Sequence, residues 1–153
     1  MRLTSRIFRL ISPGLAAALL IMPPQIGQAD QSTQTGTGPL LVELNKVEEI
    51  EAGGCRAFFL FRNQTGKSFS GFEMSLAILD GDGIIDRLLS VDASPLPVQR
   101  TTLKLFEIPE ITCGNISEIL LHDITSCQPQ NEAEMDCFAI LSLASRSAAK
   151  LVK

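Results

Sequence analysis

The chain has 153 residues, with 13 Lys or Arg, 17 Asp or Glu and one His, which give a formal net charge of −4 at pH 7. This length fits one domain with a hydrophobic core. Because the basic residues are few and scattered, the composition excludes a nucleic-acid groove and argues against docking on anionic lipid.

The N-terminal segment has the layout of an export signal. Three arginines and no acidic residue accompany an apolar stretch at residues 10–22. Small residues, Gly27 and Ala29, then occupy the −3 and −1 places of a cleavage site, which predicts a signal peptide over residues 1–29 and a mature start at Asp30. An uncleaved anchor is the alternative, but the stretch is shorter than the roughly 20 apolar residues of a spanning helix. We expect a periplasmic or secreted protein with no membrane span after cleavage.

The next segment, residues 30–39, is rich in Gln, Ser, Thr and Gly. It offers nothing to bury and is typical of a disordered leader. Cleavage removes three arginines and no acidic residue, so the mature chain is more acidic than the precursor. We expect one folded domain at residues 40–148 and a C-terminal tail at residues 149–153.

Short apolar runs with period-two texture, separated by Gly, Pro, Asn and Asp, fill the rest of the chain. They predict strands at residues 40–50, 56–63, 69–79, 84–91, 101–108, 116–125 and 138–145. Seven short strands indicate an all-β fold, an immunoglobulin-like antiparallel β-sandwich. Helix is the alternative for the last two runs, whose Leu, Ala and Glu content suits either state.

Alternation assigns faces to two of these runs, because successive strand residues point to opposite sides. In the second run, Ala57, Phe59 and Phe61 share one face, whereas Phe58 and Leu60 share the other with two arginines. The third run directs one face to the core, made of Phe72, Met74, Leu76 and Ile78.

The four residues at 80–83, Asp-Gly-Asp-Gly, predict a tight hairpin between the third and fourth strands. Asp80, Asp82 and Asp86 also fall at positions 1, 3 and 7 of a calcium loop. Ile85 and Val91, however, occupy the places of the required Gly and bidentate Glu. We therefore predict a turn and no metal site.

The four cysteines can be paired from strand direction. If consecutive strands alternate, Cys55 and Cys113 lie at one end of the sandwich, and Cys127 and Cys137 lie at the other. A strand of about eight residues spans roughly 26 Å, whereas a disulfide joins Cα atoms within about 7 Å. The pairing Cys55–Cys113 with Cys127–Cys137 is the one that fits. Metal binding by the four is the alternative, but no C-x2-C pair exists and exported cysteines are usually oxidised.

Residues that could support catalysis are sparse. His122 is the single histidine, and its neighbour Asp123 points to the opposite face of a strand, so the two do not form part of a triad. No nucleophile elbow, metalloprotease motif or phosphate-binding glycine loop is present. We predict no catalytic residue and no cofactor. Residues 63–65 and 115–117 match the N-glycosylation pattern.

Several short segments together resemble a known group of sequences: Leu44-Asn45-Lys46, Cys55-Arg56, residues 61–66 (FRNQTG), residues 79–83 (LDGDG), Leu96-Pro97, residues 113–116 (CGNI), and Cys127 and Cys137 followed by residues 143–146 (LASR). The chain resembles an uncharacterised family of small exported alphaproteobacterial proteins with an immunoglobulin-like, four-cysteine domain. The resemblance implies export, one domain and disulfide staples, and no assigned activity. Residues 101–104 depart from the family's Arg-rich fifth strand.

Two functional hypotheses follow. The first is a non-catalytic interaction module of the cell envelope, in which the outward residues Phe58 and Leu60 contact another envelope or periplasmic protein. The second is a small-ligand binding protein or enzyme with a site in the end loops, near His122 or residues 132–136. A purely structural envelope protein is a third possibility, which the sequence does not separate from the first.

Overall fold

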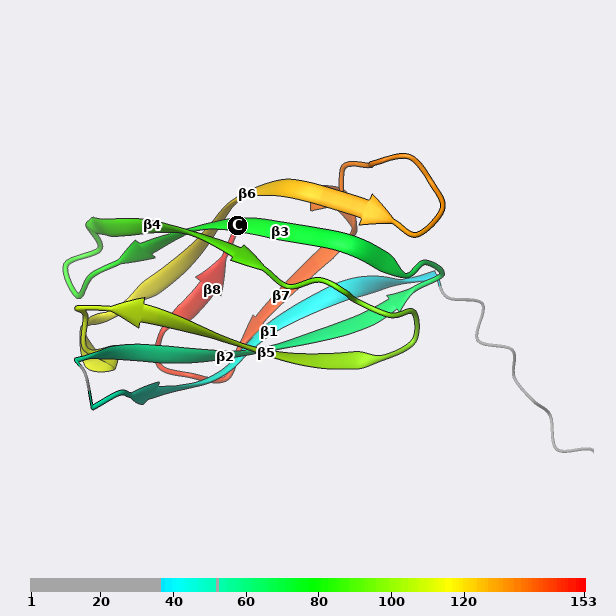
Figure 1. Ribbon diagram of the computed structural model, residues 1–153. Coiled ribbons are helices and arrows are strands. Elements are labelled where there is room, and N and C mark those ends of the chain that lie inside the picture. Colours follow the sequence, from blue (N-terminus) through cyan, green and yellow to red (C-terminus); the bar gives the residue numbers. More distant parts are fainter. Residues whose placement is uncertain (1–36, 52) are drawn as a thin grey trace, which may run out of the picture. The chain divides into compact units, whose positions relative to one another are not determined.

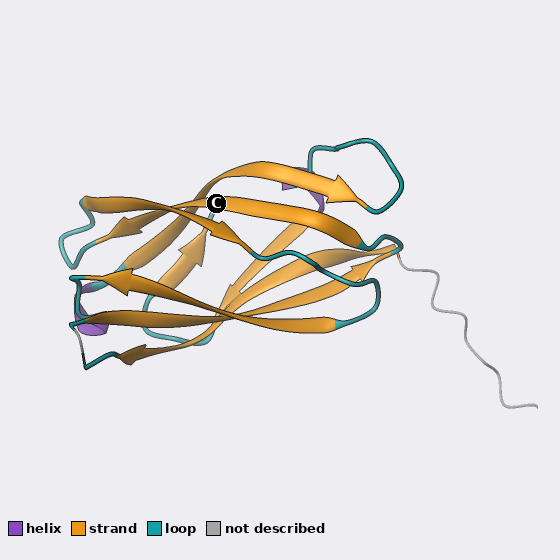
Figure 2. Ribbon diagram, in the orientation of Figure 1, coloured by secondary structure: helices purple, strands orange, loops and turns teal. Residues whose placement is uncertain are grey.

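A computed structural model describes residues 37–51 and 53–153 of the chain. The predicted signal peptide and residues 30–36 of the predicted leader lie outside the described residues. The described part is all-β, with two short 3-10 turns, η1 (Cys113–Asn115) and η2 (Phe138–Ile140) (Figure 2).

Eight strands form two four-stranded sheets that lie face to face (Figure 1). The strands are β1 (Thr37–Glu49), β2 (Gly54–Thr65), β3 (Phe69–Leu79), β4 (Ile85–Asp92), β5 (Thr101–Pro109), β6 (Glu118–Pro129), β7 (Leu141–Ser145) and β8 (Lys150–Val152). The first sheet has the order β5-β2-β1-β7 and the second sheet the order β4-β3-β6-β8.

The sheets are mixed, which corrects the expectation of antiparallel pairing throughout. β1–β2, β2–β5, β3–β4 and β3–β6 are antiparallel, whereas β1–β7 and β6–β8 are parallel. The cause is the return of the chain: β7 adds to the first sheet beside β1, and β8 then adds to the second sheet beside β6. The last two strands each join a strand far away in sequence that runs the same way.

The strand count is also one higher than predicted. Residues 149–153, expected to be a tail, contain β8, whose Leu151 is buried and pairs with Ile119 of β6. Three residues are too few to show a period-two pattern, so this strand had no signal in the sequence. Strand is confirmed over helix for the sixth run, whereas the seventh begins as η2 and continues as β7.

Phenylalanine side chains dominate the core between the two sheets. The ring of Phe72 on β3 lies 6.1 Å from that of Phe61 on β2 and 6.2 Å from that of Phe69, centroid to centroid. Phe59 lies 5.7 Å from Phe106 of β5. The predicted core faces are confirmed, and the following members are at most 2% exposed: Ala57, Phe59, Phe61, Phe72, Met74, Leu76 and Ile78. Because adjacent positions of β2 alternate between this core and the outside, Phe58 and Leu60 must face outward.

The hairpin between β3 and β4 has the predicted turn chemistry. The Asp80 carboxylate accepts hydrogen bonds from the backbone N–H groups of Asp82 at 3.0 Å and Ile84 at 2.9 Å. Gly83 has φ +77, a conformation that glycine adopts without strain. Asp80 therefore serves the turn itself.

Both predicted disulfides are confirmed. Cys55–Cys113 joins the start of β2 to η1, with Cα atoms 4.9 Å apart. Cys127–Cys137 joins β6 to the segment before η2, with Cα atoms 6.0 Å apart. Among the described residues no cysteine is free. Figure 1 shows the start of β2 and the end of β6 at opposite ends of the two sheets, which is the geometry that the pairing required.

Candidate functional site

The predicted partner-surface residues Phe58 and Leu60 lie on the outer face of the first sheet and are half-buried. Directly opposite on the edge strand β5, Phe58 pairs with Leu105 and Leu60 pairs with Leu103. Leu103 is 53% exposed and Leu105 is 48% exposed. We call these four residues the contact patch. Sequence reasoning found its β2 half and missed its more exposed β5 half.

Side chains from β1 cover the other flank of the contact patch. The Lys46 ammonium lies 4.1 Å from the ring centroid of Phe58, within the range of a cation–π contact. Leu60 pairs with Glu43 across the β1–β2 ladder. Phe58 and Leu60 are thus flanked by charged residues of β1, whereas the contact patch is exposed on its β5 side.

Glu43 is a buried carboxylate on this outer face, with only 2% of its surface exposed. Asn45 Nδ2 donates a hydrogen bond to Glu43 Oε1 at 2.9 Å, and Oε2 lies 3.4 Å from Arg62 Nη1 and 3.5 Å from Arg146 Nε. The hydrogen bond from Asn45 holds the pKa of Glu43 below its usual value, against the opposing effect of burial and with support from Arg62 and Arg146. The carboxylate therefore stays charged and fixes both guanidinium groups.

A second set of ion pairs lies at the far end of the same face. Arg56 contacts Glu107 at 2.8 Å and Glu48 at 3.2 Å, and Glu48 also binds Lys46. The hydrogen bond with Lys46 lowers the pKa of Glu48, and the hydrogen bond to Glu107 raises the pKa of Arg56. Of the seven ion pairs that the described residues form, five lie on this face. The contact patch thus has charged pairs at both ends.

A hollow of about 160 Å³ lies beside the Arg62 end of the contact patch. Its lining is polar and consists of Arg62, Asn63, Gln64, Gln99, Arg100 and Thr101. Gln99 has φ +55, and its Nε2 donates to the backbone carbonyls of Gln64 at 3.4 Å and Thr65 at 3.3 Å. These bonds tie the start of β5 to the end of β2.

Asn63, which lines the same hollow, holds neighbouring loops in place through hydrogen bonds of its side-chain amide. Its side chain is 2% exposed and donates to the backbone carbonyls of Lys67, Leu96 and Pro97, while its Oδ1 accepts from Thr65. Every polar atom of the amide is occupied. The glycosylation pattern at residues 63–65 therefore falls on an amide that no glycan can reach in the folded protein.

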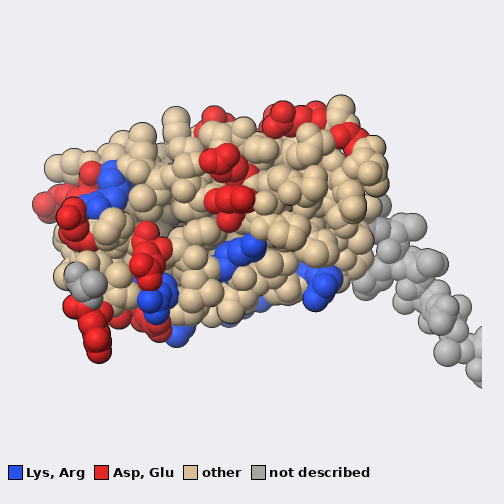
Figure 3. Space-filling model, viewed as in Figure 1, with Lys and Arg blue, Asp and Glu red and all other residues tan. Residues whose placement is uncertain are grey.

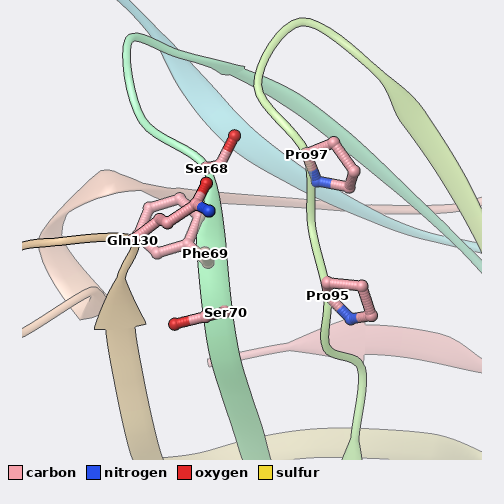
Figure 4. A pocket seen from close by; sticks show the side chains of 6 residues that line it. All are labelled: Ser68, Phe69, Ser70, Pro95, Pro97 and Gln130. Carbon is pink, nitrogen blue, oxygen red and sulfur yellow. The ribbon is translucent and has the colours of Figure 1, made fainter.

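A second hollow of about 160 Å³ lies at the same end, lined by Ser68, Phe69, Ser70, Pro95, Pro97 and Gln130 (Figure 4). Ser68 Oγ accepts a hydrogen bond from the Val98 N–H at 2.9 Å, and Ser70 Oγ donates to the Gln128 carbonyl at 3.2 Å. Both hydroxyls are thus engaged by the fold, which leaves few polar groups to orient a ligand.

The residues of the alternative hypothesis are dispersed. His122 is exposed on β6, and neither of the two hollows includes it. In the loop that follows β6, Glu132 binds Lys67, Glu134 accepts from the Cys127 N–H, and Asp136 accepts from the Phe138 N–H at 2.8 Å. These carboxylates stabilise the loop, and a ligand site around them stays a prediction.

Residues 37–51 and 53–153 contain neither a metal-binding cluster nor a membrane-spanning helix. No group of three His, Cys, Asp or Glu side chains is placed to hold a metal ion. No helix in this part of the chain has the length and hydropathy to cross a membrane.

The edge strands β4 and β5 carry inward-pointing cations. Lys104 Nζ on β5 donates to the Ser94 carbonyl, and Arg87 Nη1 on β4 donates to the Pro109 carbonyl, each at 2.5 Å. Ser94 follows β4 and Pro109 ends β5, so each bond joins one sheet to the other along the open side. Inward charges on edge strands disfavour the addition of another strand. The β4 and β5 edges are therefore protected against the addition of another strand.

The outer face of the second sheet has a different charge. A row of apolar residues crosses it, formed by Leu88, Ala77, Leu120 and Val152. Acidic residues surround this row: Glu73, Asp92, Glu118 and Asp123. In Figure 3 most blue atoms lie over the lower sheet, the first, whereas red atoms line the upper sheet and the left-hand end. The outer faces of the two sheets thus differ more in the sign of their charge than in their apolar content.

The chain resembles a solved structure in its fold. No family model matches it, and no curated protein matches it. Among solved structures it is similar to IrmA from Escherichia coli, with a TM-score of 0.54 and 13% sequence identity over 69% of this chain and 90% of that chain. At this identity the likeness shows the fold alone.

Proposed function

We propose that this chain is an exported, non-catalytic module of the cell envelope that binds another envelope protein through the outer face of its first sheet. The two disulfides support export, because such bonds persist in oxidising compartments. We further propose that the domain is immunoglobulin-like and belongs with the small exported alphaproteobacterial proteins that its motifs resemble. Two packed four-stranded sheets and the Cys55–Cys113 staple support that assignment.

The observation that carries the proposal is the contact patch. Leu103 and Leu105 are about half exposed on a regular strand, where each adjoins an apolar partner on β2. Contiguous exposed apolar surface with a polar rim is typical of protein contact sites. The ion pairs of Glu43 and Arg56 supply such a rim and fix it in place before a partner arrives.

The partner should present an apolar surface flanked by acidic groups. Lys46 is 53% exposed and Arg146 is 68% exposed at their side chains, and each lies beside a carboxylate that is less exposed than the cation. At Lys46 and Arg146 an approaching protein therefore meets the cation before its carboxylate, whereas Glu107 is more exposed than its partner Arg56. Complementary charge steers association and excludes partners of the same sign.

A pair of matched variants tests the proposal. Leu103→Thr/Leu105→Thr removes the exposed half of the contact patch while retaining strand propensity. Leu88→Thr on the second sheet removes a residue of similar exposure, 61%, from the other face. The partner is first identified by affinity capture of the tagged protein from the host envelope and mass spectrometry. Its affinity is then measured by biolayer interferometry.

We expect the β5 double variant to bind at least tenfold more weakly and the Leu88 variant to bind as the wild type does. Circular dichroism melting of each variant serves as the folding control. Equal affinity of the β5 double variant and the wild type would refute a role for the contact patch. Weaker binding by the Leu88 variant alone would move the site to the second sheet.

A further inference from the structure

The hollow beside the contact patch has an excess of positive charge in an acidic protein. Arg62 and Arg146 share one carboxylate, Glu43, and Arg100 lines the same hollow as Arg62. Three guanidinium groups thus stand against one buried carboxylate, although the whole chain has a net charge of −4. A local reversal of sign of this kind attracts an anionic group.

Arg100 is the uncommitted member of this group. Within residues 37–51 and 53–153 its side chain forms no ion pair and no hydrogen bond. Its backbone is nevertheless held, because its carbonyl accepts from the Asn63 N–H at 2.9 Å. The preceding residue, Gln99, is fixed in a left-handed conformation by its bonds to β2. The base of the side chain is therefore ordered while its guanidinium is available.

The size of the hollow limits what it can hold. Sites for whole small molecules measure about 300–1,000 Å³, whereas this one measures about 160 Å³. It can accept one functional group rather than a whole ligand. A planar guanidinium pairs best with a carboxylate or a phosphate, by two parallel hydrogen bonds.

The position of Arg62 connects the hollow to the contact patch. Arg62 and Leu60 are two positions apart on β2 and face the same side, which places them about 7 Å from each other. Thr101 and Leu103 on β5 repeat the same spacing. One extended peptide can therefore place an apolar side chain on the patch and its next outward side chain at the hollow.

We infer that the hollow between Arg62 and Arg100 binds a carboxylate of a partner protein whose neighbouring apolar side chains lie on the contact patch. This inference rests on the proposed function and names the group that the partner presents. Carboxylate is favoured over phosphate because it is the anion that every protein surface carries. Arg62, already anchored by Glu43, positions the group, and Arg100 supplies the free donors.

Two peptides that differ by one group test the inference: acetyl-Leu-Leu-Glu-Leu-amide and its neutral Gln analogue. Each is titrated into the ¹⁵N-labelled purified protein, and the amide shifts of Gln99, Arg100 and Leu103 are followed. We expect the Glu peptide to bind at least fivefold more tightly, with an advantage that shrinks as salt rises. Arg100→Gln should reduce the ratio of the two affinities to about one. Lys150→Gln, an exposed cation on β8, should leave the ratio unchanged.

The possible outcomes separate this inference from the proposed function. If both peptides bind the wild-type protein equally, or if inorganic phosphate shifts these amides and the Glu peptide does not, the inference is wrong. If Leu103→Thr/Leu105→Thr leaves both affinities unchanged while the preference for the Glu peptide persists, the hollow binds a carboxylate and the proposed binding role of the contact patch is wrong. Loss of affinity for both peptides in that variant, with loss of preference in Arg100→Gln, supports both statements.

Discussion

The two sheets of this domain carry apolar residues on their outer faces but organise charge in opposite ways. On the first sheet, cations and carboxylates are paired, and the carboxylate of Glu43 is buried beneath two arginines. On the second sheet, the carboxylates of Glu73, Asp92, Glu118 and Asp123 form no ion pair with any described residue. Exposed apolar area alone would not distinguish the faces.

The difference teaches that fixed charge, more than hydrophobicity, distinguishes the face that we propose for partner binding. Unpaired surface carboxylates keep a protein soluble and demand no particular geometry. Burial of the Glu43 carboxylate has a desolvation cost, which an exposed carboxylate on a sheet face would not incur. Its two arginines and Asn45 offset that cost and hold a rigid basic rim beside Leu60.

The largest expected effects come from removing the two disulfides, which involve one strand of each sheet. Cys55–Cys113 closes a separation of 58 residues on the central strand β2, and Cys127–Cys137 closes 10 residues after β6. In the chain-entropy model the longer loop is worth about 4 kcal/mol and the shorter about 3 kcal/mol. We expect Cys55→Ala/Cys113→Ala to lower the free energy of unfolding more than Cys127→Ala/Cys137→Ala does.

Urea unfolding of the oxidised proteins measures both losses. The m-value should rise when a disulfide is removed, and more for the pair 58 residues apart, because the unfolded chain without the cross-link is less compact. A greater loss from the short-loop variant would show that the second sheet depends on its staple through native contacts, against the entropic ranking.

The next effect isolates the buried carboxylate. Glu43→Ala leaves Arg62 and Arg146 without their shared partner and removes the acceptor of the Asn45 amide. Because both arginines are partly exposed, we expect a loss of about 2 kcal/mol, below the range for a fully buried pair. Glu118→Ala on the second sheet should change stability by no more than about 0.5 kcal/mol. Equal losses at the two sites in urea unfolding would erase the contrast between the faces.

Much of the fold was predictable from the sequence, since it depends on local pattern. Period-two runs placed the strands, and the core face of β3 followed from Phe72 and Met74. The disulfide pairing followed from strand direction, because the length of a strand excludes crosswise bonds. These inferences needed no knowledge of which strands are neighbours.

Which strands are neighbours was not predictable from the sequence. The parallel strand pairs and β8 were missed for that reason. β7 and β8 join strands distant in sequence, so nothing local in residues 141–145 or 150–152 records the partner. The family resemblance and the functional hypotheses are likewise untouched by the fold and stay predictions.

The contact patch was predictable by half. In β5 alternation gives two equivalent choices, with Leu103 and Leu105 inside or Lys104 and Phe106 inside. The structure buries Phe106 with Ile108 and thereby turns Lys104 inward, where the Ser94 carbonyl accepts its ammonium. The burial of Glu43 had no signal in the sequence, because part of its cover comes from Arg146, 103 residues away.

The smallest expected effect is a pH dependence confined to the first sheet. The pKa of Glu43 is lower in the folded protein than the ordinary value of 4.5, mainly through the Asn45 hydrogen bond. A carboxyl whose pKa falls on folding contributes its full stability above its unfolded pKa and loses it as the pH drops through the folded pKa. The stability gap between wild type and Glu43→Gln should therefore be constant at neutral pH and narrow below about pH 4.5.

Asn45→Ala sharpens this measurement, because it removes the largest cause of the lowered pKa while keeping both arginines. With the folded pKa closer to the unfolded one, the narrowing should still begin near the unfolded pKa, but it should be smaller and should end at higher pH than in the wild type. Asp92, whose pKa is lowered by its hydrogen bonds from Ser94, is present in every variant and cancels in the difference. Urea midpoints between pH 3 and 7 supply the curves. A gap that stays constant down to pH 3 would mean that folding does not lower the pKa of Glu43, and Asn45→Ala would then leave the curve unmoved.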